Sequence, residues 1–335
     1  MNPASVTPVT SPTYIAHASM NSRHELRSAL EQEAAGLASP DVLRAAREIS
    51  DQYRAGRPTR MASRAHAQAY ASTRMPATSA ANRAAMGQMS RRMDAGSVHS
   101  LLDVGGGPGT AMWAAAEVFP TLEKVTIIER DRRLIELGRR LAGHGSHPAV
   151  RGAEWREGNA GTAFEPHDLV VISYVLGELP QIASLLTAAW SAARVALLVI
   201  EPGTPAGFAR ILEARSFLLE RGGHVVAPCP HHLACPMAEA GDWCHFAARL
   251  ERTSLHRRAK QGTLGYEDEK FSYVAAAKEL LAVPRARIVR HPLKQPGHVR
   301  LTLCTEGRLE HPTIGKSRKD LYRAARQAEW GDEWS

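Results

Sequence analysis

The sequence predicts an α/β protein built on a doubly wound, mainly parallel sheet, and three observations lead to this prediction. Short apolar runs alternate with helical patterns between residues 98 and 221, as expected for parallel strands covered by helices on both faces. A glycine cluster follows the first apolar run, and an acidic residue ends the second. Together these features predict a ligand site at the carboxyl ends of the strands.

The composition excludes several classes of protein. The 335 residues are 44% hydrophobic and 23% charged, which is typical of globular chains and excludes collagen-like and wholly disordered proteins. No apolar run reaches about 18 residues, so we expect no transmembrane helix and no membrane partner. The start of the chain lacks the basic and apolar regions of a secretory signal. We expect a monomer in the bacterial cytoplasm, or in the mitochondrial matrix if the source is eukaryotic.

Charge is unevenly distributed along the chain. Residues 1–97 carry 12 basic and 7 acidic residues, residues 98–244 carry 12 and 16, and residues 245–335 carry 18 and 11. Two basic flanks therefore enclose an acidic middle within a total net charge of +8. Such flanks predict contact with a polyanion, with an arginine-rich solvated surface as the alternative.

Two segments are predicted ahead of the core. Residues 1–21 are rich in Ser, Thr and Pro and are predicted to be disordered. From residue 22 to residue 97 apolar side chains recur at helical spacing, with an interruption at Pro76. This pattern predicts a helical N-terminal region ahead of the core.

The core is predicted to span residues 98–221. Its expected elements are strand 98–104, helix 110–119, strand 125–129, helix 132–142, strand 168–174, strand 195–201 and helix 207–221. Residues 222–284 break this rhythm and are predicted to be a Cys-rich metal-binding insertion. Residues 285–310 are predicted to form a hairpin that closes the sheet, and residues 311–335 a basic tail.

The glycine cluster lies between a strand and a helix. Gly105, Gly107 and Gly109 form G-x-G-x-G, a spacing different from the G-x-G-x-x-G of dinucleotide-binding folds. Glycines allow a sharp turn and close approach of a ligand to the backbone. Asp103 ends the strand and can receive an ammonium group. No Lys-Ser/Thr pair follows to grip phosphates, which argues against a nucleoside-triphosphate loop.

Glu129 ends the second strand, about 20 residues beyond the loop, where a carboxylate can accept hydrogen bonds from both ribose hydroxyls. A surface carboxylate is the alternative. A glycine loop followed by such an acid resembles the S-adenosyl-L-methionine (SAM) site of class I methyltransferases, in which Asn159 stands where an adenine contact lies. The resemblance implies a cofactor site comprising Asp103, Gly105, Gly107, Gly109, Glu129 and Asn159. Residues 173–180 lack the Asn/Asp-Pro-Pro-Tyr of many amino-methylating enzymes, so we assign no catalytic residue.

The four cysteines, Cys229, Cys235, Cys244 and Cys304, have the spacing C-x5-C-x8-C-x59-C. Disulfides are disfavoured in a reducing compartment, so a cysteine cluster indicates metal or redox chemistry. Four thiolates suit a tetrahedral zinc ion or an iron–sulfur cluster, and the lack of a short C-x2–4-C knuckle favours the cluster. The alternatives are buried free thiols or a zinc site that includes His231, His232 or His245.

Several motifs beyond the cysteines resemble one family, the methyltransferase-like proteins of the small ribosomal subunit. These motifs are residues 74–78 (RMPAT), 251–252, 256–257, 266–273 (YEDEKFSY), 297–299 (GHV) and the terminal 322–332. The resemblance covers roughly residues 60–335 and implies a class I fold that binds SAM. It also implies a [4Fe–4S] cluster on the four cysteines and binding to immature 16S-type rRNA of the small subunit.

We therefore expect a SAM-binding, cluster-containing protein of small-subunit assembly. Its rRNA contacts are predicted to include Arg257, Arg258, Lys260, Lys316, Arg318, Lys319, Arg323 and Arg326. Two alternatives are an active rRNA methyltransferase and a zinc-stabilised methyltransferase of a non-RNA substrate. Tyr266–Tyr273 has two interpretations, a capped helix start with Phe271 and Tyr273 in the core or a segment packed on rRNA or the cluster.

Overall fold

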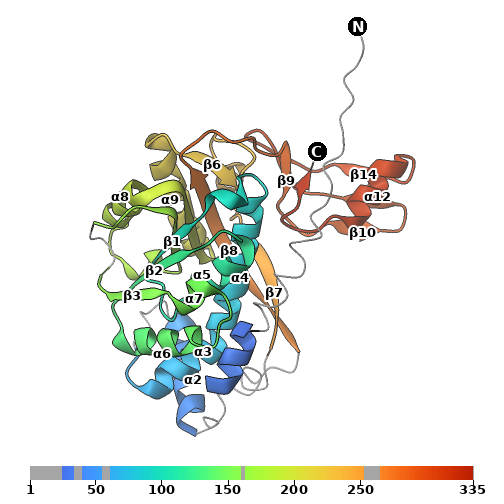
Figure 1. The fold of residues 1–335 in the computed structure, drawn as a ribbon. Helices are drawn as coiled ribbons and strands as arrows, with labels where there is room; N and C mark the ends of the chain where they lie inside the picture. Colours follow the sequence, from blue (N-terminus) through green and yellow to red (C-terminus); the bar gives the residue numbers. More distant parts are fainter. Residues whose placement is uncertain (1–24, 34–39, 55–60, 160–162, 253–264, 335) are drawn as a thin grey trace.

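The computed structural model describes residues 25–33, 40–54, 61–159, 163–252 and 265–334 (Figure 1). An eight-stranded sheet lies at its centre, in the order β3-β2-β1-β4-β5-β8-β6, with β7 paired to β8. The strands are Ser100–Val104 (β1), Lys124–Glu129 (β2), Glu154–Glu157 (β3), His167–Ser173 (β4), Ala193–Pro202 (β5), His224–Ala227 (β6), Phe246–Glu251 (β7) and Tyr266–Ala277 (β8). β1 to β5 are parallel, and β8 runs antiparallel to β5, β6 and β7. The predicted α/β fold with a mainly parallel sheet is confirmed.

Both faces of the sheet are covered, because its central strands are apolar on both sides. In β1, Leu101 belongs to one hydrophobic cluster and Leu102 to the other, and Leu169 and Val170 divide in the same way in β4. This alternation follows from the two-residue period of a strand. The core helices are Thr110–Val118 (α5), Arg132–Ala142 (α6), Pro148–Arg151 (α7), Ala183–Ala192 (α8) and Pro205–Glu220 (α9). The strand order reverses between β1 and β4, which creates a crevice at their carboxyl ends.

The N-terminal region is helical, with a helix over residues 25–33 followed by α2 (Pro40–Arg54), α3 (Arg64–Thr73) and α4 (Met75–Ser90). Pro76 lies in the first turn of α4, where its missing N–H costs nothing. The small buried residues of α4, Ala77, Ala80, Ala81 and Ala85, allow it to pack closely against α5, β7 and β8. None of the described helices is long and apolar enough to span a membrane.

A small C-terminal unit lies beside the sheet, drawn in red in Figure 1. It contains the sheets β10-β11-β14 and β13-β12-β9-β15 and the helix Lys319–Gln327 (α12). Its strands are Ala286–Ile288 (β9), Leu293–Gln295 (β10), His298–Arg300 (β11), Leu303–Cys304 (β12), Leu309–Glu310 (β13), Thr313–Gly315 (β14) and Glu333–Trp334 (β15). A separate cluster of buried residues, including Ile288, Val299, Ile314 and Ala325, stabilises it.

Two predictions about this half of the chain were wrong, as was one of the two interpretations of Tyr266–Tyr273. Residues 285–310 do not close the main sheet, since β8 does so within the predicted insertion, and residues 311–334 fold into the C-terminal unit instead of forming a tail. Tyr266–Tyr273 lies in β8 and does not start a helix, although Phe271 and Tyr273 are buried as expected. The acidic start and alanine-rich end of β8 suit a helix locally, and pairing with three neighbouring strands overrides that preference.

Candidate functional site

The glycine loop connects β1 to α5 at the strand-order reversal. Gly105, Gly107 and Gly109 all have left-handed backbones, with φ of 68°, 56° and 84°, a conformation that glycine adopts readily. The Gly105 N–H donates to Ile128 O at 2.8 Å, which ties the loop to β2. A Cβ atom on Gly105 would lie 2.6 Å from Val175 Cγ2. The loop therefore needs glycine for its backbone conformation and for its contact with the segment after β4.

Asp103 lies beneath this loop and is 1% exposed. Neither of its carboxylate oxygens has a hydrogen-bond partner within the described part of the chain. Burial, and secondarily the charge of Glu129, raise the pKa of Asp103 to about 7. A buried carboxyl group without a partner is costly in its charged form, so a cationic group bound beside it would be favourable.

Glu129 is held at the end of β2 by backbone N–H groups. Its Oε2 accepts from Gly107 N at 2.9 Å, and its Oε1 accepts from Arg130 N and Asp131 N, both at 2.8 Å. Burial raises the pKa of Glu129, and these N–H groups offset part of the rise. Asn159 is exposed, two residues after the β3 residue that pairs with Glu129. The predicted ribose and adenine contacts thus lie on neighbouring strand ends.

Trp155 on β3 is a part of this site that sequence reasoning missed. Its indole Nε1 donates to Gly107 O at 3.2 Å, and a Cβ atom on Gly138 of α6 would lie 2.7 Å from its ring. The tryptophan therefore supports the glycine loop from the side. The available signal was a single large aromatic residue within the otherwise polar segment Glu154–Glu157.

The N-terminal helices reach the carboxyl end of β4, which is a second feature that sequence reasoning missed. Asn82 of α4 donates through Nδ2 to Ser173 Oγ at 2.9 Å. Tyr174 has a left-handed backbone with φ of 61°, and its hydroxyl donates to Glu269 Oε1 at 3.1 Å. Arg74 Nη2 lies 3.4 Å from the same oxygen. A polar network of N-terminal and β8 residues therefore borders the carboxyl end of β4.

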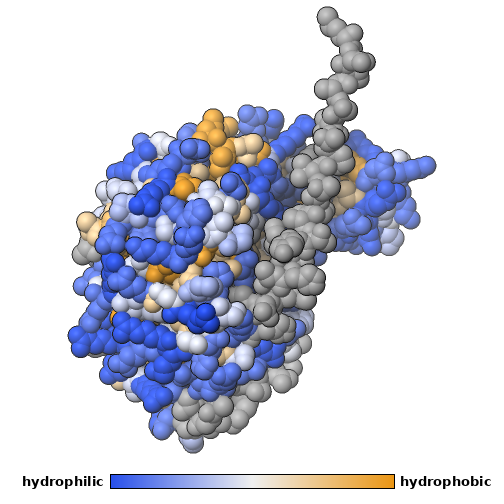
Figure 2. Space-filling view, in the orientation of Figure 1, coloured by the Kyte–Doolittle hydropathy of each residue, from blue (hydrophilic) through white to orange (hydrophobic). Residues whose placement is uncertain are grey.

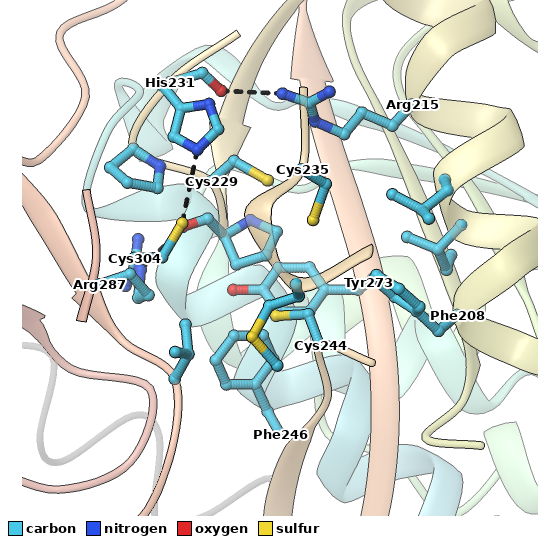
Figure 3. Close-up of a pocket in the computed structure, with 16 residues that line it drawn as sticks. Phe208, Arg215, Cys229, His231, Cys235, Cys244, Phe246, Tyr273, Arg287 and Cys304 are labelled. Atoms are coloured by element: carbon cyan, nitrogen blue, oxygen red, sulfur yellow. Dashed lines mark hydrogen bonds between the residues drawn. The ribbon is translucent and has the colours of Figure 1, made fainter. Parts of the chain in front are cut away.

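The four cysteines line one pocket, although they come from four separate segments (Figure 3). Cys229 follows β6, Cys235 precedes the short helix Pro236–Glu239 (α10), Cys244 precedes β7, and Cys304 ends β12. All four are free thiols. Among the described residues, however, no group of three or more Cys, His, Asp or Glu has the geometry to hold a metal ion. The cysteines are thus brought together without closing around a single ion.

Burial governs the chemistry of these thiols. It raises the pKa of Cys229, raises that of Cys244 well above its usual value and raises that of Cys304 to about 12. Repulsion from the neighbouring cysteines adds to the rise for each of them. Burial therefore favours the protonated form of these thiols, and a metal centre bound to them would have to displace their protons.

Three histidines were candidates for a mixed zinc site. His231 lines the pocket, with its Nε2 3.4 Å from Cys304 Sγ. His232 and His245 instead contact the backbone carbonyls of Val225 and Trp243, at 3.2 and 3.3 Å. Of the three, His231 is thus the one that lines the pocket and contacts a cysteine across it.

The C-terminal unit exposes several basic side chains. Lys316, Arg318, Lys319 and Arg326 are exposed and have no ion-pair partner within the described ranges, whereas Arg323 pairs with Asp320 at 3.1 Å. The unit, at the right of Figure 2, presents a mainly hydrophilic surface. The other predicted rRNA contacts, Arg257, Arg258 and Lys260, lie outside the described residues.

Comparisons with known proteins identify the family of the chain. Residues 64–335 match the family model described as "Mitochondrial small ribosomal subunit Rsm22". The human "Ribosome assembly protein METTL17, mitochondrial" is 30% identical over 286 residues, which cover 78% of this chain and 61% of the relative. The "Rsm22-cox11 tandem protein 2, mitochondrial" of Schizosaccharomyces pombe is 28% identical over 69% of this chain and 38% of the relative.

The chain thus spans less than two thirds of the length of these relatives. Among solved structures, the magnesium protoporphyrin IX methyltransferase of Synechocystis PCC 6803 with bound SAM is similar, with a TM-score of 0.40 and 10% identity over 72% of this chain and 99% of that chain. The family match extends over both the glycine loop and the four cysteines. The chain belongs to the Rsm22 family of mitochondrial small-ribosomal-subunit proteins.

Proposed function

We propose that the chain is an assembly protein of the small ribosomal subunit that binds SAM and a [4Fe–4S] cluster and contacts rRNA. The observation that carries this proposal is the family match over residues 64–335. The human relative, which bears the name of a ribosome assembly protein, supports the assembly role.

The geometry of the glycine loop supports SAM as the cofactor. The buried carboxylate of Asp103 has no partner within the described residues and would receive the ammonium group. Glu129 would accept hydrogen bonds from the ribose hydroxyls, and Asn159 would contact the adenine. Gly105, Gly107 and Gly109 would let the cofactor lie against the backbone. Bound SAM would supply an activated methyl group beside the end of β4.

The pocket supports a [4Fe–4S] cluster held by Cys229, Cys235, Cys244 and Cys304. All four thiols line the same pocket, and thiolates are the usual ligands of such clusters. The described residues contain no group of three or more Cys, His, Asp or Glu with the geometry to hold a metal ion, so the preference for a cluster over zinc rests on the long gaps in the C-x5-C-x8-C-x59-C spacing. Such a centre would link the loop between β6 and β7 to the C-terminal unit and order both of them.

Exposed cations of the C-terminal unit support contact with rRNA. Lys316 and Arg318 lie just before α12, Lys319 begins this helix, and Arg326 lies about two turns further along it. Phosphate contacts of this kind give affinity without sequence recognition. We propose that this surface binds the phosphate backbone of the small-subunit rRNA.

A second candidate function is active methylation of that rRNA. It is favoured by the polar network at the end of β4, where Tyr174 has a left-handed backbone and Asn82 donates to Ser173. Non-glycine residues in this conformation are often found at functional sites. The network could orient an acceptor beside the methyl group.

The names of the relatives also bear on location. The human and Schizosaccharomyces pombe relatives are both named as mitochondrial, which favours the mitochondrial-matrix alternative over the bacterial cytoplasm expected from composition. We propose the mitochondrial ribosome as the place of action for a eukaryotic source.

The experiment that tests the proposal uses the full chain, tritium-labelled SAM and precursors of the small ribosomal subunit. The expected result is salt-sensitive co-sedimentation with the precursor and no transfer of label to rRNA. Transfer of label would establish the second candidate function. Weak, salt-insensitive binding would contradict both and would favour a methyltransferase of a non-RNA substrate.

A further inference from the structure

The wall of the cysteine pocket contains two buried arginines. Arg215 of α9 is 6% exposed, and Arg287 of β9 is 1% exposed. Both line the pocket together with the four cysteines, on different sides of it (Figure 3). A buried guanidinium group is unfavourable unless a negative charge compensates it. Each of these two arginines therefore requires a compensating negative charge nearby.

Arg215 has no acidic partner in the part of the chain that the structure describes. Its Nη2 donates to the carbonyl oxygens of His231 at 3.0 Å and Leu233 at 2.8 Å, and its Nε has no hydrogen-bond partner among the described residues. No carboxylate within the described ranges lies at ion-pair distance from it. The side chain thus supports the loop between Cys229 and Cys235, but its positive charge is left uncompensated.

Arg287 is compensated only in part. Its Nε donates to Pro228 O at 2.9 Å, and its Nη1 donates to Gly331 O at 3.0 Å. Glu333 lies 3.5 Å from its Nη2, but Glu333 also forms an ion pair with Arg92. One carboxylate therefore serves two guanidinium groups. Arg287 is also the residue that pairs with Cys304 across β9 and β12.

The number of charges suggests what completes the pocket. Four thiolates carry four negative charges, and an oxidised [4Fe–4S] core or a zinc ion carries two positive ones, so either centre has a net charge of about −2. Four protonated thiols carry none. Two buried guanidinium groups match a centre of charge −2 and are unfavourable beside neutral thiols.

We infer that Arg215 and Arg287 are the counter-charges of an anionic metal–thiolate centre in this pocket. The inference rests on the proposed iron–sulfur site and adds to it the residues that stabilise the charge of the bound centre. Arg215 is the more informative of the two, because no acidic side chain of the described segments forms an ion pair with it. Both arginines are positioning residues and do not bind the metal themselves.

The test compares Arg215→Met with Arg215→Lys and with a control, Arg221→Met. Arg221 follows α9 and stacks on Phe217 away from the pocket. Each full-length protein is purified anaerobically, reconstituted with iron and sulfide, and titrated to obtain its midpoint potential. Loss of the visible band on addition of a chelator is timed, and thermal unfolding is followed with and without the cluster.

Arg215→Met is expected to release its cluster at least about tenfold faster and to have a more negative midpoint potential, because a nearby positive charge favours the reduced centre. The guanidinium group of Arg215 is compensated in the loaded wild type but is destabilising in the metal-free wild type. Arg215→Met should therefore lower the melting temperature more in the loaded protein than in the metal-free protein. Arg215→Lys should keep a potential near that of the wild type, and Arg221→Met should match the wild type throughout.

Equal losses of melting temperature with and without the cluster, together with an unchanged potential, would show that Arg215 only supports the loop and would overturn the inference. Wild-type protein that takes up neither iron nor zinc would instead overturn the proposed centre itself. If a variant does not fold with the cluster bound, its melting temperature is compared with that of the wild type in the metal-free state. A value far below that of the metal-free wild type would contradict the inference.

Discussion

The two candidate sites have opposite electrostatic requirements. At the glycine loop the carboxylate oxygens of the buried Asp103 have no hydrogen-bond partner among the described residues, so we propose that a cation such as an ammonium group completes this site. At the cysteine pocket the two buried arginines, Arg215 and Arg287, exceed the carboxylates that the described residues place near them, so we propose that an anion completes this site. The comparison teaches that a buried charge without a partner points to the sign of the charge that its site would bind.

The largest expected effect is on the cysteine pocket. Cys244→Ser removes one of the four thiols and is expected to abolish the visible absorbance of the reconstituted protein and to lower its melting temperature, because metal binding is coupled to folding. Met237→Leu, a volume-conserving change in the same pocket, should leave both unchanged. An absorbance and melting temperature that Cys244→Ser does not alter would rule out this cysteine as a ligand.

The next effect concerns the pH dependence of stability at the glycine loop. Burial raises the pKa of Asp103 from 3.8 to about 7. The contribution of this carboxyl group to the free energy of unfolding is therefore fully present below about pH 4 and is lost as the pH rises through 7. The unfolding free energy of the ligand-free protein should fall over this range by an amount on the order of 4 kcal/mol at most. Asp103→Asn should remove this part of the fall, as urea unfolding at pH 5 and pH 8 would show.

Ligand provides the matched control for that prediction. S-adenosylhomocysteine carries the ammonium group that we expect Asp103 to receive, so it should reduce the pH dependence in the wild type and have less effect in Asp103→Asn. A pH dependence that is the same in both proteins, with and without ligand, would contradict the assignment of Asp103.

A smaller effect is expected for the loop backbone. Gly105→Ala puts a Cβ atom at a left-handed residue and 2.6 Å from Val175, which costs about 1–2 kcal/mol in backbone conformation alone. We expect the affinity for S-adenosylhomocysteine, measured by calorimetry, to fall about tenfold. Gly87→Ala in α4, where nothing lies within 4 Å of the added atom, is the control and should bind like the wild type.

The smallest effect concerns the basic surface. Lys319→Gln should weaken rRNA binding a few-fold and reduce the slope of log affinity against log salt by about 1, the amount expected for one lost phosphate contact. Arg323→Gln removes a cation that already pairs with Asp320, so a smaller change is expected. Equal losses for both variants in a filter-binding titration would argue against a specific basic surface.

The same two regions differ in how far the sequence predicted them. The glycine loop, Asp103 and Glu129 were found because strand, turn and helix follow one another within about 30 residues, and local patterns reveal such units. Trp155 was missed because its contact with Gly107 depends on the pairing of β3 with β2. Asn82 was missed because α4 reaches the end of β4 only through tertiary packing.

The region around the cysteine pocket was harder to predict from the sequence than the glycine loop. The four cysteines were recognised as a group. For Tyr266–Tyr273, which lies in β8, a helix start was one of the two interpretations, because its acidic residues suit the N-terminus of a helix. The C-terminal unit was missed because its strands of two or three residues are too short to show a period. Arg215 and Arg287 have no sequence signal at all, since arginine is common on the surface and only burial makes these two unusual.

The central claim is that the cysteine pocket is completed by an anionic iron–sulfur centre, and one measurement tests it most directly. The full chain is purified without oxygen, and its visible spectrum is recorded together with its iron, sulfide and zinc contents. We predict a brown protein with about four irons and four sulfides per chain. A colourless protein without iron would contradict the claim, whether it contained zinc or no metal.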